Sequence, residues 1–543
     1  MRNKVHLVLT LCILSIAFIP RALVIAKNTM APFTNSVIAI AIETQRSGHI
    51  PSNPYTIQGF WQTHANFITS RGAPVLVLTI LSYTTGLSPK IMAFFPFQSF
   101  LFVITIYLIG QQLGNRFTGF TFAMIFGFEW HSAIFGGSFG YQQYGDLLEF
   151  VIILILVRCC VNREEWSRKD ILVVCLLFFV LYQTYYQAEF SILVLFLSMT
   201  LISLILKSFS KFNINSKSIA PIPHLALLFI SIFFGLDIVV DSFIRSASPA
   251  SFGALISNYF SYATSIIYGQ TGAVQEFRPF TNPISKYVDL VFFALMWAVI
   301  VLCIGMYFHN LGKSKSNNQL SRKENLIHVI ILSSLFVFGA RFLIYGLMGI
   351  IAIYSWPIPV SAIVLAQIWF GPRFKSKLRL QYVIPLLLVC LAVFRFSVSF
   401  NDQTLSYVGA NYRSIVGPSA YWIADYVSSG SVVSSNQASA LVFSVVAERQ
   451  KANVISVNEF LSTVENLQGD NASHLHQVLV LRGYNYLLLL KLFETQPVYG
   501  GLWGPWSPPL GTRLNNLSNA PGFLRIYDNG MSTVYQLELK RPL

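Results

Sequence analysis

Charged residues are scarce in this sequence: Asp, Glu, Lys and Arg make up only 11% of its 543 residues. Soluble domains carry about 25% charged residues, so this chain cannot cover several water-facing surfaces. Disorder is excluded too, because it requires low hydrophobicity, whereas 54% of these residues are hydrophobic. Most of the chain is therefore expected to lie in lipid.

Cysteine is scarce as well, and its placement excludes a disulfide scaffold. Each of the six cysteines lies in or beside an apolar segment, and the last 145 residues contain none. Their spacing matches no zinc motif. We interpret them as small buried apolar residues: Cys12, Cys159, Cys160, Cys175, Cys303 and Cys390.

Long apolar segments are abundant, and each has about the 17–25 residues that a helix needs to cross a bilayer. The first follows Arg2 and Lys4 but lacks a convincing signal-cleavage site, so we expect it to remain as an anchor. The sequence predicts about eleven spans, near 5–26, 90–113, 117–136, 145–161, 170–187, 189–206, 221–241, 286–308, 326–345, 347–370 and 380–398.

The net charge of +15 reports topology. With the N-terminus in the cytoplasm, sixteen basic residues fall in predicted cytoplasmic loops and five in the longer outer loops, 27–89, 137–144 and 242–285. Positive charge favours the cytoplasmic side, so this asymmetry predicts an outer C-terminus. Residues 399–543 hold nine basic and nine acidic residues and are neutral. We therefore expect no nucleic-acid partner, and a multi-pass protein of the plasma membrane.

The neutral tail, 399–543, alternates helical and strand patterns and predicts a small extracytoplasmic α/β domain with an antiparallel edge. The residues Asp528-Asn529-Gly530 tolerate positive φ and indicate a hairpin. No glycine-rich phosphate loop, acid pair or nucleophile–base pattern occurs there, so we interpret the domain as accessory. We expect helices at 414–428, 437–449 and 457–468, and strands at 431–434, 453–456, 486–490, 523–527 and 532–537. The membrane domain would then be 1–398, with long outer loops at 27–89 and 242–285.

Ionisable groups at membrane depth are costly, so each is a functional candidate. Glu129 and His131 lie near the end of the third predicted span. The loop that follows contains four glycines, and its tyrosines and amides suit sugar hydroxyls. Asp146 is a catalytic candidate, although the helix dipole offers a simpler role for it and Glu149 at the start of the fourth span. The predicted substrate-binding residues of this loop are Tyr141, Gln142 and Gln143.

Polar and aromatic residues from Tyr182 to Glu189 interrupt an apolar stretch and predict a tight outer turn between two spans. Glu189 is either a general base or cation ligand, or an interfacial cap. Arg341 has no acid nearby in sequence, and its guanidinium suits a phosphate; snorkelling to the interface is the alternative. The long outer loops contribute Glu43 as a catalytic candidate and Arg278 as a substrate-binding candidate.

The layout resembles the GT-C class of membrane glycosyltransferases, which includes oligosaccharyltransferases and protein mannosyltransferases. Ser47-Gly48-His49-Ile50-Pro51 is similar to a family stretch that follows the first acidic motif, and 113–119 to a short turn between early spans. Residues 137–146 occupy the place of the second acidic motif. The stretch 32–36, where the family has its first acid, contains no carboxylate, and the tail lacks the Trp-Trp-Asp-Tyr-Gly motif.

The resemblance implies inverting transfer of a sugar from a polyprenyl-phosphate donor to an envelope glycan, lipid or protein. One of the candidate acids, or His131, would act as base. Arg341 would hold the phosphate, and a divalent cation is a further possibility. Two alternatives stay open: a non-catalytic relative that binds a lipid-linked glycan or a protein partner, and a transporter of lipid or solute.

Overall fold

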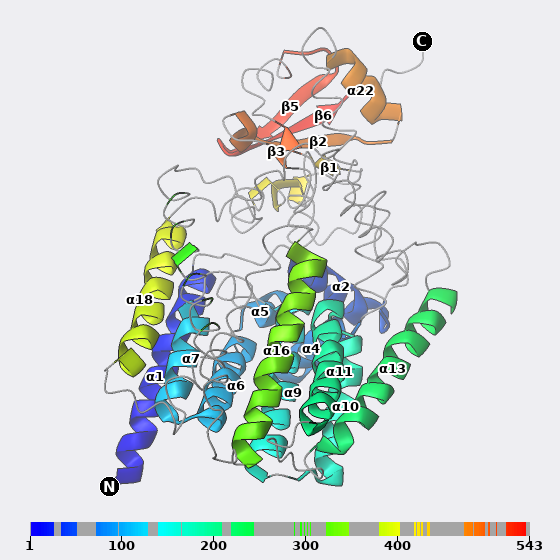
Figure 1. The fold of residues 1–543 in the computed structure, drawn as a ribbon. Coiled ribbons are helices and arrows are strands. Elements are labelled where there is room, and N and C mark those ends of the chain that lie inside the picture. The colour runs from blue at the N-terminus through cyan, green and yellow to red at the C-terminus, as the bar shows by residue number, and fades with distance from the viewer. Residues whose placement is uncertain are drawn as a thin grey trace, which may run out of the picture. The chain divides into compact units, whose positions relative to one another are not determined.

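The computed structural model divides into two compact units, residues 1–26 with 94–404 and residues 27–93 with 405–543. Figure 1 shows the helices and strands. The described residues are 2–26, 34–50, 72–95, 97–128, 139–163, 165–208, 219–243, 322–346, 380–401, 472–481, 483–494 and 519–538, with short pieces between 287 and 305, between 418 and 426, and at 432–434, 498–499, 506–507 and 517.

The first unit is helical, and its helices coincide with the apolar segments that the sequence predicts. Among the described residues, two helical stretches are long and apolar enough to cross a membrane: Pro89–Leu113, which covers the short helix α5 (Pro89–Phe94) and α6 (Phe97–Leu113), and Ala188–Lys207 within α11 (Tyr186–Ser208). The count of eleven spans stays a prediction, because 347–370 and most of 286–308 lie outside the described residues. The helices are α1 (Arg2–Ala26), α6 (Phe97–Leu113), α7 (Arg116–Phe128), α9 (Tyr141–Val157), which continues as the π-helix η1 (Arg158–Arg163), α10 (Arg168–Tyr182), α11 (Tyr186–Ser208), α13 (Pro221–Phe243), α16 (Arg322–Gly346) and α18 (Leu380–Asn401).

Small residues allow α6 and α7 to pack closely. A Cβ on Gly119 of α7 would lie 2.6 Å from the carbonyl oxygen of Tyr107 in α6. Asn115 starts α7, because its Oδ1 accepts a hydrogen bond of 3.0 Å from the N–H of Thr118. Lipid provides little hydrophobic drive between helices, so close backbone approach of this kind favours their association.

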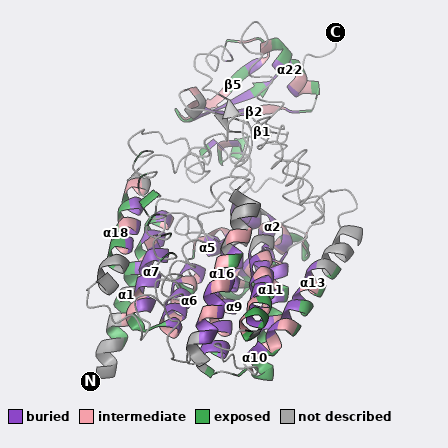
Figure 2. Cartoon of the chain, viewed as in Figure 1, coloured by how far each residue is buried: buried purple, intermediate pink, exposed green. Residues whose placement is uncertain are grey.

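Aromatic side chains fill the interior where α10, α11 and α13 meet. Phe178 stacks on Phe229 with centroids 3.8 Å apart, and Phe196 contacts Phe229 edge-on at 5.0 Å. Figure 2 shows that these helices have one buried face and one exposed face. The exposed faces carry large apolar residues such as Leu176, Leu204 and Leu227, as expected for helices that face lipid.

The second unit contains a four-stranded sheet in the order β1-β2-β6-β5. Strand β1 (Val432–Ser434) runs parallel to β2 (Tyr486–Leu490), whereas β6 (Ser532–Leu537) is antiparallel to both β2 and β5 (Phe523–Asp528). The predicted hairpin is confirmed: Gly530 has φ +80° and its N–H donates to Asp528 Oδ1 at 2.8 Å. A two-stranded sheet pairs β3 (Val498–Tyr499) with β4 (Trp506–Ser507).

Helix α22 (Ala472–Leu481), which the sequence does not predict, buries Leu475, His476 and Leu479. The predicted helices 437–449 and 457–468 and the predicted strand 453–456 lie outside the described residues. Of the predicted helix 414–428, the described positions at 418–419, 421–423 and 425–426 are helical.

A helical pair from the first predicted outer loop also belongs to the second unit. It consists of α2 (Thr34–Ser47) and α4 (Ala73–Thr85), followed by the short α5 (Pro89–Phe94). Gln45 Nε2 donates to Ser82 Oγ at 2.8 Å, and the Tyr83 hydroxyl donates to the Gln45 carbonyl at 3.0 Å. These two bonds connect α2 to α4.

Candidate functional site

Helix α9 begins earlier than the sequence suggests, and this changes the role of its acids. Gly140 is extended at the N-cap, with φ −156° and ψ 171°, and Tyr141 is the first helical residue. Asp146 and Glu149 are therefore the sixth and ninth residues, and the first turn contains no acid. The interpretation of these two acids as caps at a helix N-terminus is wrong.

The turn between α10 and α11 is confirmed, since α10 ends at Tyr182 and α11 begins at Tyr186. The N–H of Tyr185 donates to the Leu181 carbonyl at 3.0 Å, and the N–H of Glu189 donates to the Tyr185 carbonyl at 3.1 Å. These bonds continue the helical hydrogen-bond pattern across the turn. Glu189 lies in the first turn of α11, where the helix dipole favours its charge.

Gly145 brings α9 into direct contact with this turn. A Cβ on Gly145 would lie 2.5 Å from the Cβ of Tyr185, so no larger residue fits there without movement. Further along, Ile153 and Leu156 of α9 line the same cavity as Leu195 of α11. The two helices therefore run side by side in the same direction.

This geometry places two acids at corresponding levels. Glu149 is one helical turn after Gly145, and Glu189 is one turn after Tyr185, because residues four apart share a helix face. Both glutamates are 0% exposed, and Asp146, three residues before Glu149 on α9, is partly exposed. We name these three acids of the adjacent helices α9 and α11, Asp146, Glu149 and Glu189, the acid cluster. Burial of a carboxylate is expensive, so such a cluster calls for a functional account.

The acid cluster does not have the geometry of a metal site. Among the described residues, no group of three or more His, Cys, Asp or Glu could hold a metal ion. A divalent cation therefore stays a sequence-based expectation.

The loop residues predicted to bind sugar lie at the start of α9. Gln143 is buried, and its amide oxygen lies against the backbone of Gly140. This position is typical of a side chain that supports a helix start. Tyr141 and Gln142 are helical, but the positions of their side chains lie outside the described structure.

Helix α16 crosses α11 and carries Arg341 toward its C-terminal end. Ser198 Oγ of α11 contacts the Ser333 carbonyl at 3.5 Å. Arg341 is seven residues, or about two helical turns, after the buried Ser334. It therefore lies on the same face of α16 as Ser334. The Arg341 side chain itself is not described.

Glu43 belongs to the second unit. It lies in α2, it is half-buried, and its Oε2 atom is buried without a hydrogen bond to any described residue. Glu129, His131 and Arg278 lie outside the described residues.

Three buried charged residues were missed as candidates: Glu149, Arg21 and Arg395, which are 0%, 0% and 3% exposed. Arg21 and Arg395 lie within predicted spans, so the principle that charges at membrane depth deserve scrutiny would have found them. The sequence assigns Glu149 to a helix start, whereas α9 begins at Tyr141 and places Glu149 in its third turn.

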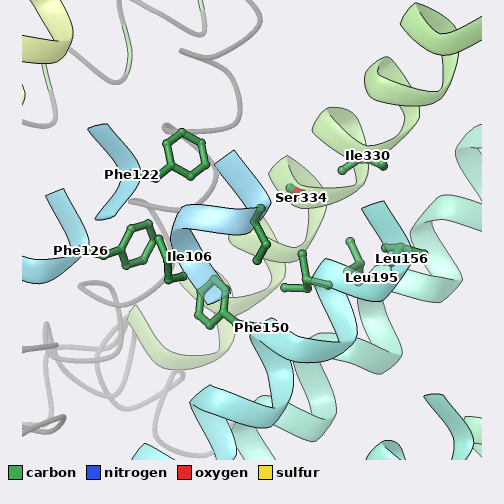
Figure 3. Close-up of a pocket in the computed structure, with 10 residues that line it drawn as sticks. Ile106, Phe122, Phe126, Phe150, Leu156, Leu195, Ile330 and Ser334 are labelled. Atoms are coloured by element: carbon green, nitrogen blue, oxygen red, sulfur yellow. The ribbon is translucent and has the colours of Figure 1, made fainter. Parts of the chain in front are cut away.

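A small cavity lies deeper in the helical unit, between α6, α7, α9, α11 and α16 (Figure 3). Its volume is about 20 Å³, and Ser334 is the polar residue of an otherwise apolar lining that includes Phe122, Phe150 and Leu195. Ligand pockets typically measure about 300–1,000 Å³, whereas a water needs about 10–15 Å³. We therefore interpret this cavity as a packing void.

The sequence matches no protein-family model, and it matches no curated protein. Two solved structures of the oligosaccharyltransferase of Archaeoglobus fulgidus are similar. The complex with Zn and sulfate has a TM-score of 0.56 at 13% identity over 89% of this chain and 68% of that one. The form tethered to an acceptor peptide with the Asn-Val-Thr sequon has a TM-score of 0.50 at 11% identity over 97% of this chain and 74% of that one.

These similarities define the class of fold. The chain has a GT-C-like fold, which agrees with the predicted resemblance. Two helices of the described residues, Pro89–Leu113 and Ala188–Lys207, agree by length and composition with the predicted membrane location.

Proposed function

We propose that this protein is an inverting membrane glycosyltransferase that transfers a sugar from a polyprenyl-phosphate donor to an envelope glycan, lipid or protein on the outer face. The observation that carries the proposal is the acid cluster, in which Glu149 and Glu189 are fully buried at corresponding levels of adjacent helices. The GT-C-like fold supports glycosyl transfer as the reaction class.

Glu189 is our first choice for the general base. A base must remove the proton of the acceptor hydroxyl as the sugar is transferred, and a buried carboxylate is a stronger base than an exposed one. Glu149 lies at the corresponding level of α9 and is the second buried acid of the proposed site. Asp146, which is partly exposed, would face the acceptor.

Arg341 is proposed to hold the donor phosphate. In the predicted topology α16 runs opposite to α11. Ser198 of α11 contacts Ser333 of α16. Glu189 is nine residues before Ser198, and Arg341 is eight residues after Ser333. With the helices antiparallel, both residues lie toward the same end of the helix pair. At 1.5 Å per residue these distances are about 13 Å and 12 Å, so the arginine and the base reach one level. A guanidinium there would stabilise the departing phosphate.

The remaining candidates complete the proposal. Glu129, His131 and Glu43 are secondary candidates for acid–base roles, and Arg278 for the phosphate. Tyr141 and Gln142 would contact the sugar, whereas Gln143 is better explained as support for the start of α9.

The first outer loop lacks the carboxylate that GT-C glycosyltransferases have there, and this favours a second candidate function. The stretch 32–36 contains no acid, so a non-catalytic relative that binds a lipid-linked glycan is the second candidate.

The test is a set of single substitutions expressed in the native host in place of the chromosomal copy. We expect Glu189→Gln to lower the yield of its envelope glycan by about 10²–10⁴-fold, the usual contribution of a general base. Glu165→Gln, at an exposed glutamate beyond η1, is the matched control and should retain the wild-type yield. Glycan mass spectrometry at equal protein levels measures the effect.

Wild-type glycans in Glu189→Gln, Glu149→Gln and Asp146→Asn alike would refute catalysis by the acid cluster. If glycans were also unchanged on deletion of the whole gene, glycosyl transfer itself would be rejected.

A further inference from the structure

Arg21 is a buried arginine of α1 to which the proposed mechanism gives no role. It is 0% exposed. Its Nη1 and Nη2 donate to the carbonyls of Gly127 at 3.2 Å and Phe126 at 3.4 Å, which lie in the last turn of α7. The guanidinium therefore binds two backbone carbonyls of the last described turn of α7.

The same guanidinium lies over an aromatic cluster that joins α7 to α9. Its Cζ is 5.3 Å from the centroid of Phe102 in α6. Phe102 meets Phe150 edge-on at 5.3 Å, and Phe126 meets Phe150 at 5.7 Å. Phe150 follows Glu149 directly in α9. The Arg21 guanidinium thus contacts α7 directly. It also contacts Phe102, whose ring in turn contacts Phe150 of α9, the residue after Glu149.

Close backbone contact fixes this arrangement. A Cβ on Gly127 would lie 2.5 Å from the carbonyl oxygen of Ala17, and Ala17 is one helical turn before Arg21. The α1 backbone therefore touches the last turn of α7, which leaves the guanidinium within reach of the α7 carbonyls. Any residue larger than glycine would separate the two helices.

The chain between these two anchor points carries most of the candidate chemistry. Glu129 and His131 come immediately after α7, and Asp146 lies on α9 before Phe150. We infer that Arg21 is a positioning residue that fixes α7 relative to α9 and thereby positions the α9 acids Asp146 and Glu149. This inference rests on the proposed function for its effect on activity, and on the contacts above for its effect on structure.

The first experiment measures structure and does not depend on activity. Amide hydrogen exchange of the purified full-length protein in detergent is compared for wild type, Arg21→Met, Arg21→Lys and Phe102→Leu. Arg21→Met should raise exchange about tenfold or more in peptides covering 124–131 and 139–147, with α11 and α13 unchanged. Arg21→Lys, which keeps the charge and one donor, should show a smaller rise. Arg116→Met removes an exposed arginine at the other end of α7 and should match wild type.

Wild-type exchange at 124–131 and 139–147 in Arg21→Met would overturn the inference. If Arg21→Met loses its fold and exchanges everywhere, Phe102→Leu decides, because it keeps the Arg21 bonds to the α7 carbonyls and removes the ring that connects the guanidinium to Phe150. A local rise in Phe102→Leu supports the inference, and wild-type exchange overturns it.

The second experiment separates positioning from general stability. Membranes holding each variant are titrated with a lipid extract of host membranes as the donor source. Arg21→Met should lower the maximal rate of glycan formation about 100-fold, the cost expected from misplacement of about 1 Å. The half-saturating amount of extract should change less than threefold, and Arg21→Lys should recover at least a tenth of the wild-type rate.

Loss of rate through weaker donor saturation alone would contradict positioning. If wild type forms no glycan with the extract, the proposed function fails, while the exchange experiment still decides the role of Arg21.

Discussion

The helical unit and the C-terminal sheet differ in which side chains they bury and which they expose. The helical unit buries Arg21, Glu149 and Glu189 and exposes leucines such as Leu197. The sheet buries Leu487 to Leu490 and keeps the ion pair of Lys491 with Asp528 at its surface. The first pattern is the one expected of helices in lipid, and the second is the one expected of a sheet in water. The buried charges do not by themselves favour the stability of the helical unit, which fits the role that the proposed function gives them.

The largest expected effect tests whether burial of leucine stabilises the two regions equally. Leu488→Ala in β2 should lower the stability of the sheet by about 2–5 kcal/mol, because both hydrophobic transfer and packing are lost. Leu195→Ala in α11 should cost roughly half as much, since lipid is as apolar as the helix interior. Local hydrogen exchange of β2 and of α11 measures both losses. Equal losses would contradict the contrast.

The second prediction places the same charge on both outer surfaces. Leu197→Lys, in the middle of the apolar helix Ala188–Lys207, should cost about 2.5–3.5 kcal/mol of membrane insertion. Leu524→Lys on the edge strand β5 should change stability by less than about 0.5 kcal/mol, because lysine suits exposed sheet edges. A membrane-insertion assay and thermal unfolding give the two values. Unimpaired insertion of Leu197→Lys would mean that this face of α11 is not in lipid.

The third prediction concerns glycines that serve different purposes. Gly145 provides space against Tyr185, whereas Gly530 provides a positive φ and has nothing within 4 Å of an added Cβ. Gly145→Ala should cost about 1–3 kcal/mol through overpacking, and Gly145→Asn should be worse. Gly530→Ala should cost about 1–2 kcal/mol through backbone strain, and Gly530→Asn should recover most of it. Thermal unfolding of the four variants checks this order, and the reverse order for asparagine would refute it.

The smallest effect is a pH dependence confined to the sheet. Partial burial alone would raise the pKa of the Asp528 carboxyl, but the Gly530 N–H, Lys491 and Arg525 outweigh it and hold the pKa below its usual value. A lowered pKa stabilises the folded state above the unfolded-state pKa of about 3.9, and this contribution disappears as pH falls through the folded-state value.

Asp528→Asn should therefore lose at most about 1 kcal/mol at neutral pH and match wild type at pH 2. Exchange of β2 and β6 amides from pH 7 to pH 2 measures this. A deficit that persists at pH 2 would assign the effect to the turn geometry, in which Asp528 Oδ1 accepts from Gly530.

Local signals predicted a large part of the fold. The hairpin around Gly530 and the strand 486–490 were found because turn chemistry and a continuous apolar run are properties of neighbouring residues. The turn from Tyr182 to Glu189 was found because it interrupts an apolar run. Helix α22 was missed because its buried side, Leu475 and Leu479, is defined by a sheet that comes later in the chain.

The site was harder to predict because its contacts are distant in sequence. Arg21 meets carbonyls 105 and 106 residues away, and no pattern along the chain reveals such a partner. Asp146 and Glu189 were identified by charge alone. The burial of Glu149 beside them depends on the contact of Gly145 with Tyr185, which only the packed helices show.

The contact at Gly145 also limits how α9 and α11 can move relative to each other. A Cβ at Gly145 would lie 2.5 Å from the Cβ of Tyr185, so the α9 backbone cannot move closer to α11 at this level. For the proposed function, this means that the relative levels of Glu149 and Glu189 are set before any substrate arrives.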